Sequence, residues 1–185
     1  NYCVNNKSIS FIQQFKAGDQ KAFDSLVFLH KDWVIGMIYN MVHNRQDAED
    51  ISQDVFVSVY FSLKKFKEES AFKTWLYRIA INKINAHFRK VKLKSMFNFN
   101  LSEVDELNIV YNDEDQIFKE FDKKILQKNI LSLSGKQRNV LLLRVYQNHS
   151  FKEIGEYLDI SVNNAKVVYH KAKESIIKKM KRYAG

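Results

Sequence analysis

Apolar residues recur at helical spacing along most of the chain, and this pattern predicts helices rather than strands. The first helix is expected to begin at an N-cap, Ser8, and to end at Gly18. Asp19 is the expected cap of a second, longer helix that reaches Met41. Each of these helices carries one apolar face, so the two are expected to pack against each other.

Residues 47–63 are predicted to form a third helix with two different faces. Ile51, Val55 and Val59 lie four residues apart and are expected to form the buried side. A separate stripe carries three carboxylates, Asp47, Asp50 and Asp54. The stripe is either a solvated surface or a face for a basic partner, and Asp47 is also the expected N-cap of the helix.

A fourth helix is predicted over residues 72–90, after a charged loop at 64–70. Its apolar residues Trp75, Leu76 and Ile79 are expected to face inward. The polar and basic residues expected on the outer side are Arg78, Asn82, Lys83, Asn85, Arg89 and Lys90. Aromatic rings beside cations suit unpaired nucleic acid, although a tryptophan such as Trp75, taken alone, is more often a core residue.

The regular pattern stops after the fourth helix. Residues 95–119 are rich in acidic side chains and are expected to form a flexible linker, with a helix resuming near Gln116. The linker divides the chain into a first domain over 1–94 and a second over 120–185. We therefore predict an all-α protein of two small helical domains, in agreement with the absence of proline.

The second domain is predicted to contain short helices that begin at serine N-caps, Ser134, Ser150 and Ser161. A helix over 151–158, a turn at 159–161 and a last helix have the spacing of a helix-turn-helix. The residues of the last helix that are expected to face inward are Ala165, Tyr169, Ala172 and Ile176.

The outer face of the last helix carries groups that can read DNA. In a helix-turn-helix the second helix enters the major groove, where asparagine pairs with adenine, lysine with guanine or phosphate, and valine meets the thymine methyl group. The candidate DNA-binding residues are Ser161, Asn163, Asn164, Lys166, Val167, His170, Lys171 and Lys173. The alternative is a helical hairpin whose basic face is only solvated.

Charge changes sign twice along the chain. Residues 1–90 carry 13 basic and 9 acidic side chains, residues 91–122 carry 3 and 8, and residues 123–185 carry 14 and 4. The net charge of +9 is therefore divided between two basic bodies on either side of an acidic segment. This arrangement suits two polyanion-binding domains and a segment that avoids or imitates nucleic acid.

Other features restrict the class of the protein. One cysteine excludes an internal disulfide, and five scattered histidines have no metal-ligand spacing, so we expect no metal and no cofactor. No apolar run is long enough to span a bilayer and no signal-peptide pattern is present, so we expect a cytoplasmic protein without membrane insertion. No nucleophile–base pair is evident, so we expect no catalytic residues.

Six stretches of the sequence resemble extracytoplasmic-function (ECF) sigma factors, group 4 of the sigma-70 family. Those that resemble region 2 are Gly18-Asp19 with Ala22-Phe23 and Leu26, Asp47 to Phe56, and Phe72 to Asn82. Those that resemble region 4 are Leu133 to Leu142, Phe151 to Gly155, and Ser161 to Ala172. The resemblance covers residues 8–90 and 120–182 in order.

The resemblance implies an alternative sigma factor that binds core RNA polymerase, directs it to promoters and helps to melt the −10 element. The polymerase contacts would be the flap of the second largest subunit and the clamp of the largest, the latter through Asp47, Asp50, Gln53, Asp54 and Phe56. The implied −10 contacts are Lys64, Lys65, Phe66, Lys73, Trp75, Arg78, Asn82, Lys83, Arg89 and Lys90, with the loop 64–71 receiving a flipped base. The last helix would read the −35 element, and the acidic linker would thread toward the polymerase active-site cleft.

The sequence departs from the family pattern at several positions of the second domain. Family members usually have Leu-Pro where Leu133-Ser134 stands, often glycine in place of Asp159, and commonly Thr-Val in place of Asn164-Ala165. A basic residue is frequent in place of Val168. These differences leave the −35 sequence open and suggest that a recruiting partner helps to place the chain on DNA. The resemblance to the family also leads us to expect an anti-sigma factor as a partner.

Two other functions remain open at this point. A stand-alone helix-turn-helix regulator would use its first half for dimerisation or ligand binding. A nucleic-acid-processing enzyme subunit would use the basic faces, but the chain lacks paired carboxylates that suit a catalytic metal.

Overall fold

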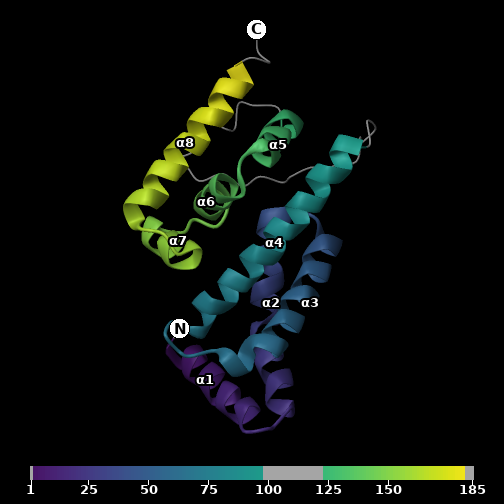
Figure 1. Ribbon diagram of the computed structural model, residues 1–185, viewed down its shortest axis with the longest axis vertical. Helices are drawn as coiled ribbons and strands as arrows, with labels where there is room; N and C mark the ends of the chain where they lie inside the picture. The colour runs from purple at the N-terminus through teal and green to yellow at the C-terminus, as the bar shows by residue number, and fades with distance from the viewer. Residues whose placement is uncertain (1, 98–122, 182–185) are drawn as a thin grey trace. The chain divides into compact units, whose positions relative to one another are not determined.

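The computed structural model describes residues 2–97 and 123–181, and no strand occurs among them. Two compact units divide inside the fourth helix, at Ile84 and Asn85. In chain order the elements are α1 (Tyr2–Lys16), α2 (Lys21–Val42), α3 (Arg45–Ser62), the 3-10 turn η1 (Leu63–Lys65), α4 (Phe72–Phe97), α5 (Lys123–Ser132), α6 (Gly135–Val145), α7 (Phe151–Leu158) and α8 (Val162–Lys181) (Figure 1). The predicted all-α fold is confirmed, and no helix in the described ranges is both long and apolar enough to cross a membrane.

The turn between α1 and α2 is built on Gly18. Its φ of 108° is a left-handed conformation that favours glycine, and its N–H donates to the Phe15 carbonyl at 3.0 Å. The Asp19 carboxylate then accepts from the N–H of Lys21, the first residue of α2, at 2.9 Å. The predicted end of the first helix at Gly18 is confirmed.

The predicted N-cap at Ser8 is wrong, because α1 already begins at Tyr2. Ser8 is buried in the middle of the helix, where its hydroxyl donates to the Val4 carbonyl at 2.8 Å. The same oxygen lies 2.8 Å from Nε2 of His30 in α2. Ser8 therefore links two helices instead of beginning one.

Helix α3 is capped by Asn44, whose side chain accepts from the Asp47 N–H at 2.9 Å. The predicted cap at Asp47 is therefore wrong by one helical turn, since Asp47 is the third residue of α3. The predicted buried face is confirmed: Ile51 is 6% exposed, and Val55 and Val59 are fully buried.

Helix α4 is longer than the sequence pattern predicts, because it continues past Lys90 to Phe97. Residues 95–97, which the pattern assigns to the linker, are helical. Leu76 is buried as predicted, whereas Trp75 and Ile79 are only partly buried. The other buried residues of the helix are Phe72, Tyr77, Ala80, Ile81, Ile84 and Phe88. The rest of the predicted linker and the expected restart near Gln116 lie outside the described residues.

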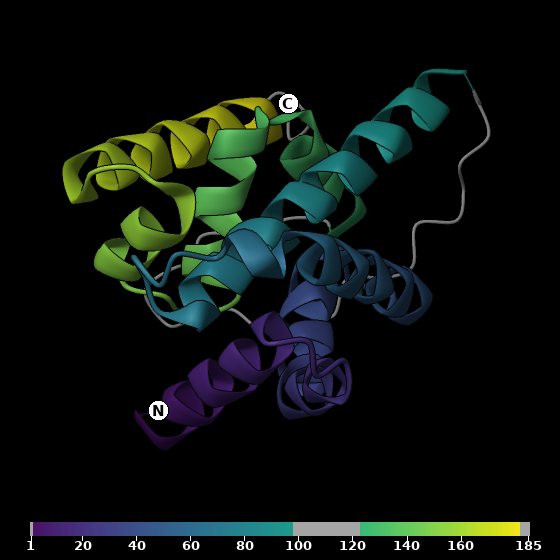
Figure 2. The same cartoon turned by 60° about the horizontal axis from the view of Figure 1, so that its bottom comes forward.

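In the C-terminal unit, α8 runs along α5, α6 and α7 and closes their core (Figures 1 and 2). The predicted caps Ser134 and Ser150 are confirmed, and each forms a capping box with the residue three positions later. The inward residues predicted for α8 are all buried, namely Ala165, Tyr169, Ala172 and Ile176.

Gly155 fixes the distance between α7 and the turn that follows it. A Cβ atom at this position would lie 2.7 Å from the backbone oxygen of Ile160, so Gly155→Ala forces the turn to move. We expect a net loss of about 1 kcal/mol in the free energy of unfolding, because the cost of such overpacking exceeds the gain in helix propensity. The measurement is urea unfolding followed by circular dichroism.

Gly36→Ala is the matched control, because nothing lies within 4 Å of the Cβ it would add to α2. We expect no loss of stability for this variant. Equal stability of Gly155→Ala and Gly36→Ala would contradict the close approach at Gly155.

Candidate functional site

The first candidate surface is the exposed side of α3. Asp50, Gln53 and Asp54 are exposed, whereas Asp47 and Phe56 are partly buried. Asp50 and Asp54 lie one turn apart on the same row, and the Gln46 amide donates to the Asp50 carboxylate at 3.1 Å. The structure thus presents two carboxylates to solvent on one side of the helix, with Gln53 and Phe56 on the neighbouring row.

The row of carboxylates continues into apolar residues that the sequence analysis missed. Val57 and Phe61 follow Asp54 at steps of three and four, and they are 55% and 76% exposed. Exposed large apolar side chains next to charges are typical of protein–protein contacts. The signal was present in the sequence, because both residues fall on the same helical row as Asp50 and Asp54.

The second candidate surface surrounds the start of α4, where three aromatic rings are in contact. The ring of Phe66 lies 5.7 Å from that of Phe72 and 5.0 Å from that of Trp75, and the last two are 5.7 Å apart. Phe66 is only 4% exposed, so it supports Trp75 from below and does not offer its own ring to DNA. Its expected role as a direct DNA contact is corrected accordingly, because a buried ring cannot stack on a base.

Trp33 of α2 adds a further ring to this surface. It is partly exposed, its ring lies 5.4 Å from that of Tyr77, and the Lys73 ammonium group lies 4.6 Å above its centroid. This distance is that of a cation–π contact. Lys73 and Trp33 therefore form one cationic and aromatic element, and Trp33 is a residue that the sequence analysis did not select.

His30 supports the same surface from inside. Its ring lies 5.2 Å from that of Phe72, and its Nε2 faces the Ser8 hydroxyl, whose own proton is given to Val4. Burial and the nearby Lys73 ammonium group lower the pKa of His30 to about 4. The imidazole is therefore neutral at physiological pH, with Nε2 as the donor to Ser8.

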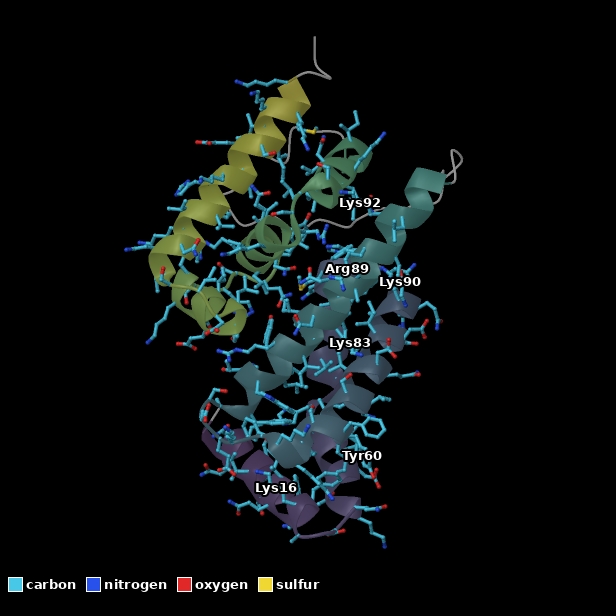
Figure 3. All side chains as sticks on the ribbon, viewed as in Figure 1. Lys16, Tyr60, Lys83, Arg89, Lys90 and Lys92 are labelled. Atoms are coloured by element: carbon cyan, nitrogen blue, oxygen red, sulfur yellow. The ribbon has the colours of Figure 1, made fainter. Side chains whose placement is uncertain are left out.

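The polar and basic residues predicted for the outer side of α4 follow one another along the helix. Asn82, Arg89 and Lys90 are exposed, and Arg78 and Lys83 are partly buried. Figure 3 shows Lys83, Arg89 and Lys90 in succession along α4, followed by Lys92, which is also exposed. Lys64 and Lys65, which the sequence pattern assigns to the loop, lie in η1 and are exposed as well. The predicted cations thus follow the aromatic cluster along α4 as far as Lys90.

The third candidate surface is the outer face of α8. Ser161 caps this helix by accepting from the Asn164 N–H at 3.1 Å, and Asp159 in the turn before it has a φ of 54°. The exposed residues on this face are Ser161, Val162, Asn163, Asn164, Lys166, Val167, His170 and Lys171. Val162 was missed by the sequence analysis. Lys173 is partly buried because its ammonium group lies 5.4 Å from the Tyr169 ring centroid, so it sits at the edge of this face.

Contacts at the start of α7 hold the first helix of this motif. The Arg144 guanidinium donates to the His149 carbonyl at 3.2 Å and lies 5.2 Å from the Phe151 ring. Phe151 in turn packs against Tyr169 of α8, with ring centroids 5.5 Å apart. The hydrogen bonds from Ser150 keep the pKa of Glu153 below its usual value, so the capping carboxylate stays ionised.

Comparisons with known proteins identify two separate segments of the chain. Residues 26–93 match the sequence profile of sigma-70 region 2, and residues 123–176 match that of sigma-70 region 4. The chain belongs to the sigma-70 family. It is similar to the ECF RNA polymerase sigma factor SigW of Bacillus subtilis, with 32% identity over 92% of this chain and 95% of the relative.

Further relatives are RNA polymerase sigma factors too. The chain is 28% identical to the ECF RNA polymerase sigma-E factor of Escherichia coli strain K12, over 91% of this chain and 92% of the relative. It is also 28% identical to the RNA polymerase sigma-H factor of Pseudomonas aeruginosa, over 90% of each chain. Sequence relatives thus identify this sigma factor as one of the ECF group, directing transcription.

Solved structures show the same fold. CnrH, solved in complex with the cytosolic domain of CnrY, has a TM-score of 0.57 and 20% identity over 93% of this sigma factor and 96% of CnrH. RpoE, solved in complex with the anti-sigma factor NepR from Bartonella quintana, has a TM-score of 0.55 and 18% identity over 87% and 98% of the two chains. At these identities the likeness supports the fold alone.

The low pKa of His30 predicts a pH-dependent stability of the N-terminal unit. The unfolded chain binds a proton near pH 6.5 and the folded chain only near pH 4, so stability is lost as the pH falls between these values. His43, whose pKa burial also lowers to about 4, adds to the effect. We expect the fall in Tm between pH 7 and pH 5 to be smaller in His30→Gln than in the wild type.

Tryptophan fluorescence suits this measurement, because both tryptophans, Trp33 and Trp75, belong to the N-terminal unit. His170→Gln, on the exposed face of α8, is the control and should leave the pH dependence unchanged. The same fall in Tm for wild type and His30→Gln would contradict a neutral, buried His30.

Proposed function

We propose that this sigma factor binds core RNA polymerase through the exposed side of α3 and promoter DNA through α4 and α8. The observation that carries the proposal is the contrast between these faces. Helix α3 presents Asp50 and Asp54 beside Val57 and Phe61, whereas α8 presents lysines and asparagines from a capped helix-turn-helix. An acidic and apolar face repels nucleic acid and suits a basic protein partner, while a basic face suits DNA.

For the polymerase, the expected partner of α3 is the clamp of the largest subunit. Asp50 and Asp54 would meet basic side chains, and Val57 and Phe61 would extend the contact with apolar area. Gln53 and Phe56 lie on the adjacent row and would complete the interface, and Asp47 would lie at its edge. The flap of the second largest subunit is the expected contact of the C-terminal unit.

For the −10 element, the expected contact is the aromatic surface at the start of α4. Melted bases can stack on partly exposed rings such as Trp75 and Trp33 while cations hold the backbone. The loop 64–71 would receive a flipped base, with Lys64 and Lys65 near the phosphates. The cations farther along α4, Arg78, Lys83, Arg89 and Lys90, would follow the adjacent duplex, with Asn82 among them.

For the −35 element, the first two turns of α8 would enter the major groove. Asn163 and Asn164 stand at the start of the helix, where base edges come within reach. Val167 is 50% exposed and could meet a thymine methyl group, and Lys166 and Lys171 would bind phosphate or guanine. Lys173, which lies against Tyr169, would contribute only from the edge.

The proposed organisation has a first domain over 1–94, an acidic linker over 95–119 and a second domain over 120–185, with activity in the cytoplasm. The chain is proposed to be a transcription initiation factor without catalytic residues of its own. An anti-sigma factor is a proposed partner, because the Bartonella quintana RpoE is bound to the anti-sigma factor NepR. A stand-alone helix-turn-helix regulator is the alternative if polymerase does not bind.

Charge reversal on α3 tests the polymerase contact. The double variant Asp50→Lys, Asp54→Lys should lose stoichiometric co-purification with core RNA polymerase, because like charges across an interface cost several kcal/mol. Asp24→Lys, Asp32→Lys is a matched control on exposed positions of α2 and should retain polymerase. If the α3 variant still co-purifies with polymerase and its circular dichroism spectrum is unchanged, this face is not the clamp contact.

Removal of two lysines from α8 tests the contact with duplex DNA. Lys166→Ala, Lys171→Ala should weaken binding of upstream promoter duplex and lower the salt slope by about one for each lost phosphate contact. Polymerase association should not change. Lys178→Ala, Lys181→Ala, at exposed positions near the other end of the same helix, is the control. An equal loss for both variants would show that only net charge matters.

A further inference from the structure

We propose that Lys16 is a positioning residue for the base-receiving loop 64–71. This inference rests on the proposed function of that loop in −10 recognition. Lys16 is the last residue of α1, and its Nζ donates to the carbonyl oxygen of Phe66 at 2.6 Å. The hydrogen bond joins residues fifty positions apart in the sequence.

The hydrogen bond fixes the backbone at Phe66, where the chain leaves the buried core. Phe66 follows η1 and has an extended backbone, with φ −65° and ψ 119°, while its N–H donates back to Leu63. The Lys16 ammonium group also lies 5.9 Å from the Phe66 ring centroid. Lys16 thus fixes both the carbonyl and the ring of Phe66, the residue that joins η1 to the exposed part of the loop.

Phe15, the residue before Lys16, packs α1 against the C-terminal part of α3. Phe15 is buried, and its ring lies 5.4 Å from that of Tyr60. Figure 3 shows Lys16 on α1 and Tyr60 on α3. Phe15 and Lys16 therefore contact the two ends of the segment that runs from Tyr60 to Phe66. The packing of Phe15 against Tyr60 gives Lys16 a defined position.

The loop itself needs such a support. Residues 67–69 are exposed, and Glu68 has a φ of 62°, which costs a non-glycine residue about 1 kcal/mol or more. Strained backbone of this kind persists only where the flanking structure determines it. On one side this structure is Phe66 with Lys16, and on the other it is the buried Phe72 at the start of α4.

The support comes from a part of the chain that precedes the matched region 2 profile, which begins at residue 26. Loss of Lys16 should leave the loop attached through its buried phenylalanines but free to change its path. Base selection at the position read by the loop should then decline, while polymerase binding through α3 continues.

The test uses holoenzyme reconstituted with core RNA polymerase. Wild type, Lys16→Met and Lys16→Arg are each offered a pool of single-stranded DNA oligonucleotides randomised over the −10 element, and bound molecules are sequenced. Wild type should enrich one base at one or more positions. In Lys16→Met the enrichment at one position should fall about three- to tenfold, the worth of one net hydrogen bond, and Lys16→Arg should restore most of it.

Lys7→Met is the matched control, an exposed lysine elsewhere on α1. An effect confined to stability would lower total recovery without changing the base preference, and this outcome would overturn the positioning role. Unchanged enrichment in Lys16→Met would also overturn the positioning role, whereas the proposed function of the loop in −10 recognition would still stand. If wild-type holoenzyme enriched no base at any position, the loop's proposed role in −10 recognition would fail as well.

Hydrogen exchange of the loop gives a second measurement on the same proteins. Amides of residues 67–71 should exchange faster in Lys16→Met than in wild type and Lys7→Met. Equal exchange rates in the three proteins would contradict a role of Lys16 in fixing the loop.

Discussion

The ring of Phe72 lies against three other rings in the N-terminal unit, and the candidate −10 surface depends on these contacts. Phe72 is 1% exposed and meets His30 of α2, Phe66 at the start of the loop and Trp75 on α4. Burial of so large a ring contributes about 1.5–3 kcal/mol and fixes three separate segments at once. Because Trp75 stands on this buried group, it can remain partly exposed and still keep a defined orientation.

Each unit has one helix that carries a candidate binding surface, α3 for a protein partner and α8 for DNA. In α3 the core takes one face, which leaves the row of Asp50, Asp54, Val57 and Phe61 for a protein partner. In α8 the core takes the row that includes Ala165 and so leaves a polar, basic face at the end of a capped turn. In both units, helical periodicity places the residues that stabilise the core and the candidate binding residues on different faces of the helix. Substitution of the exposed residues can therefore remove binding without loss of stability.

Much of this arrangement could be predicted from the sequence, because helical spacing and serine caps are local signals. The buried faces of α3 and α8 and the cap at Ser134 follow from such signals. The cap predicted at Ser8 is wrong because a contact distant in sequence, with His30, determines the place of this residue. The cap predicted at Asp47 is wrong for a local reason, since Asn44 three residues earlier takes that role. The burial of Phe66 and its bond with Lys16 depend on tertiary packing, which no local pattern contains.

Promoter-specific initiation by this sigma factor can be measured by transcription with purified components. Core RNA polymerase with this sigma factor would transcribe fragmented genomic DNA, and the 5′ ends of the RNA would be sequenced. We expect start sites that are absent with core polymerase alone and that share −35 and −10 elements at fixed spacing. The same start sites with and without the chain, under conditions in which it binds polymerase, would contradict its role as a sigma factor.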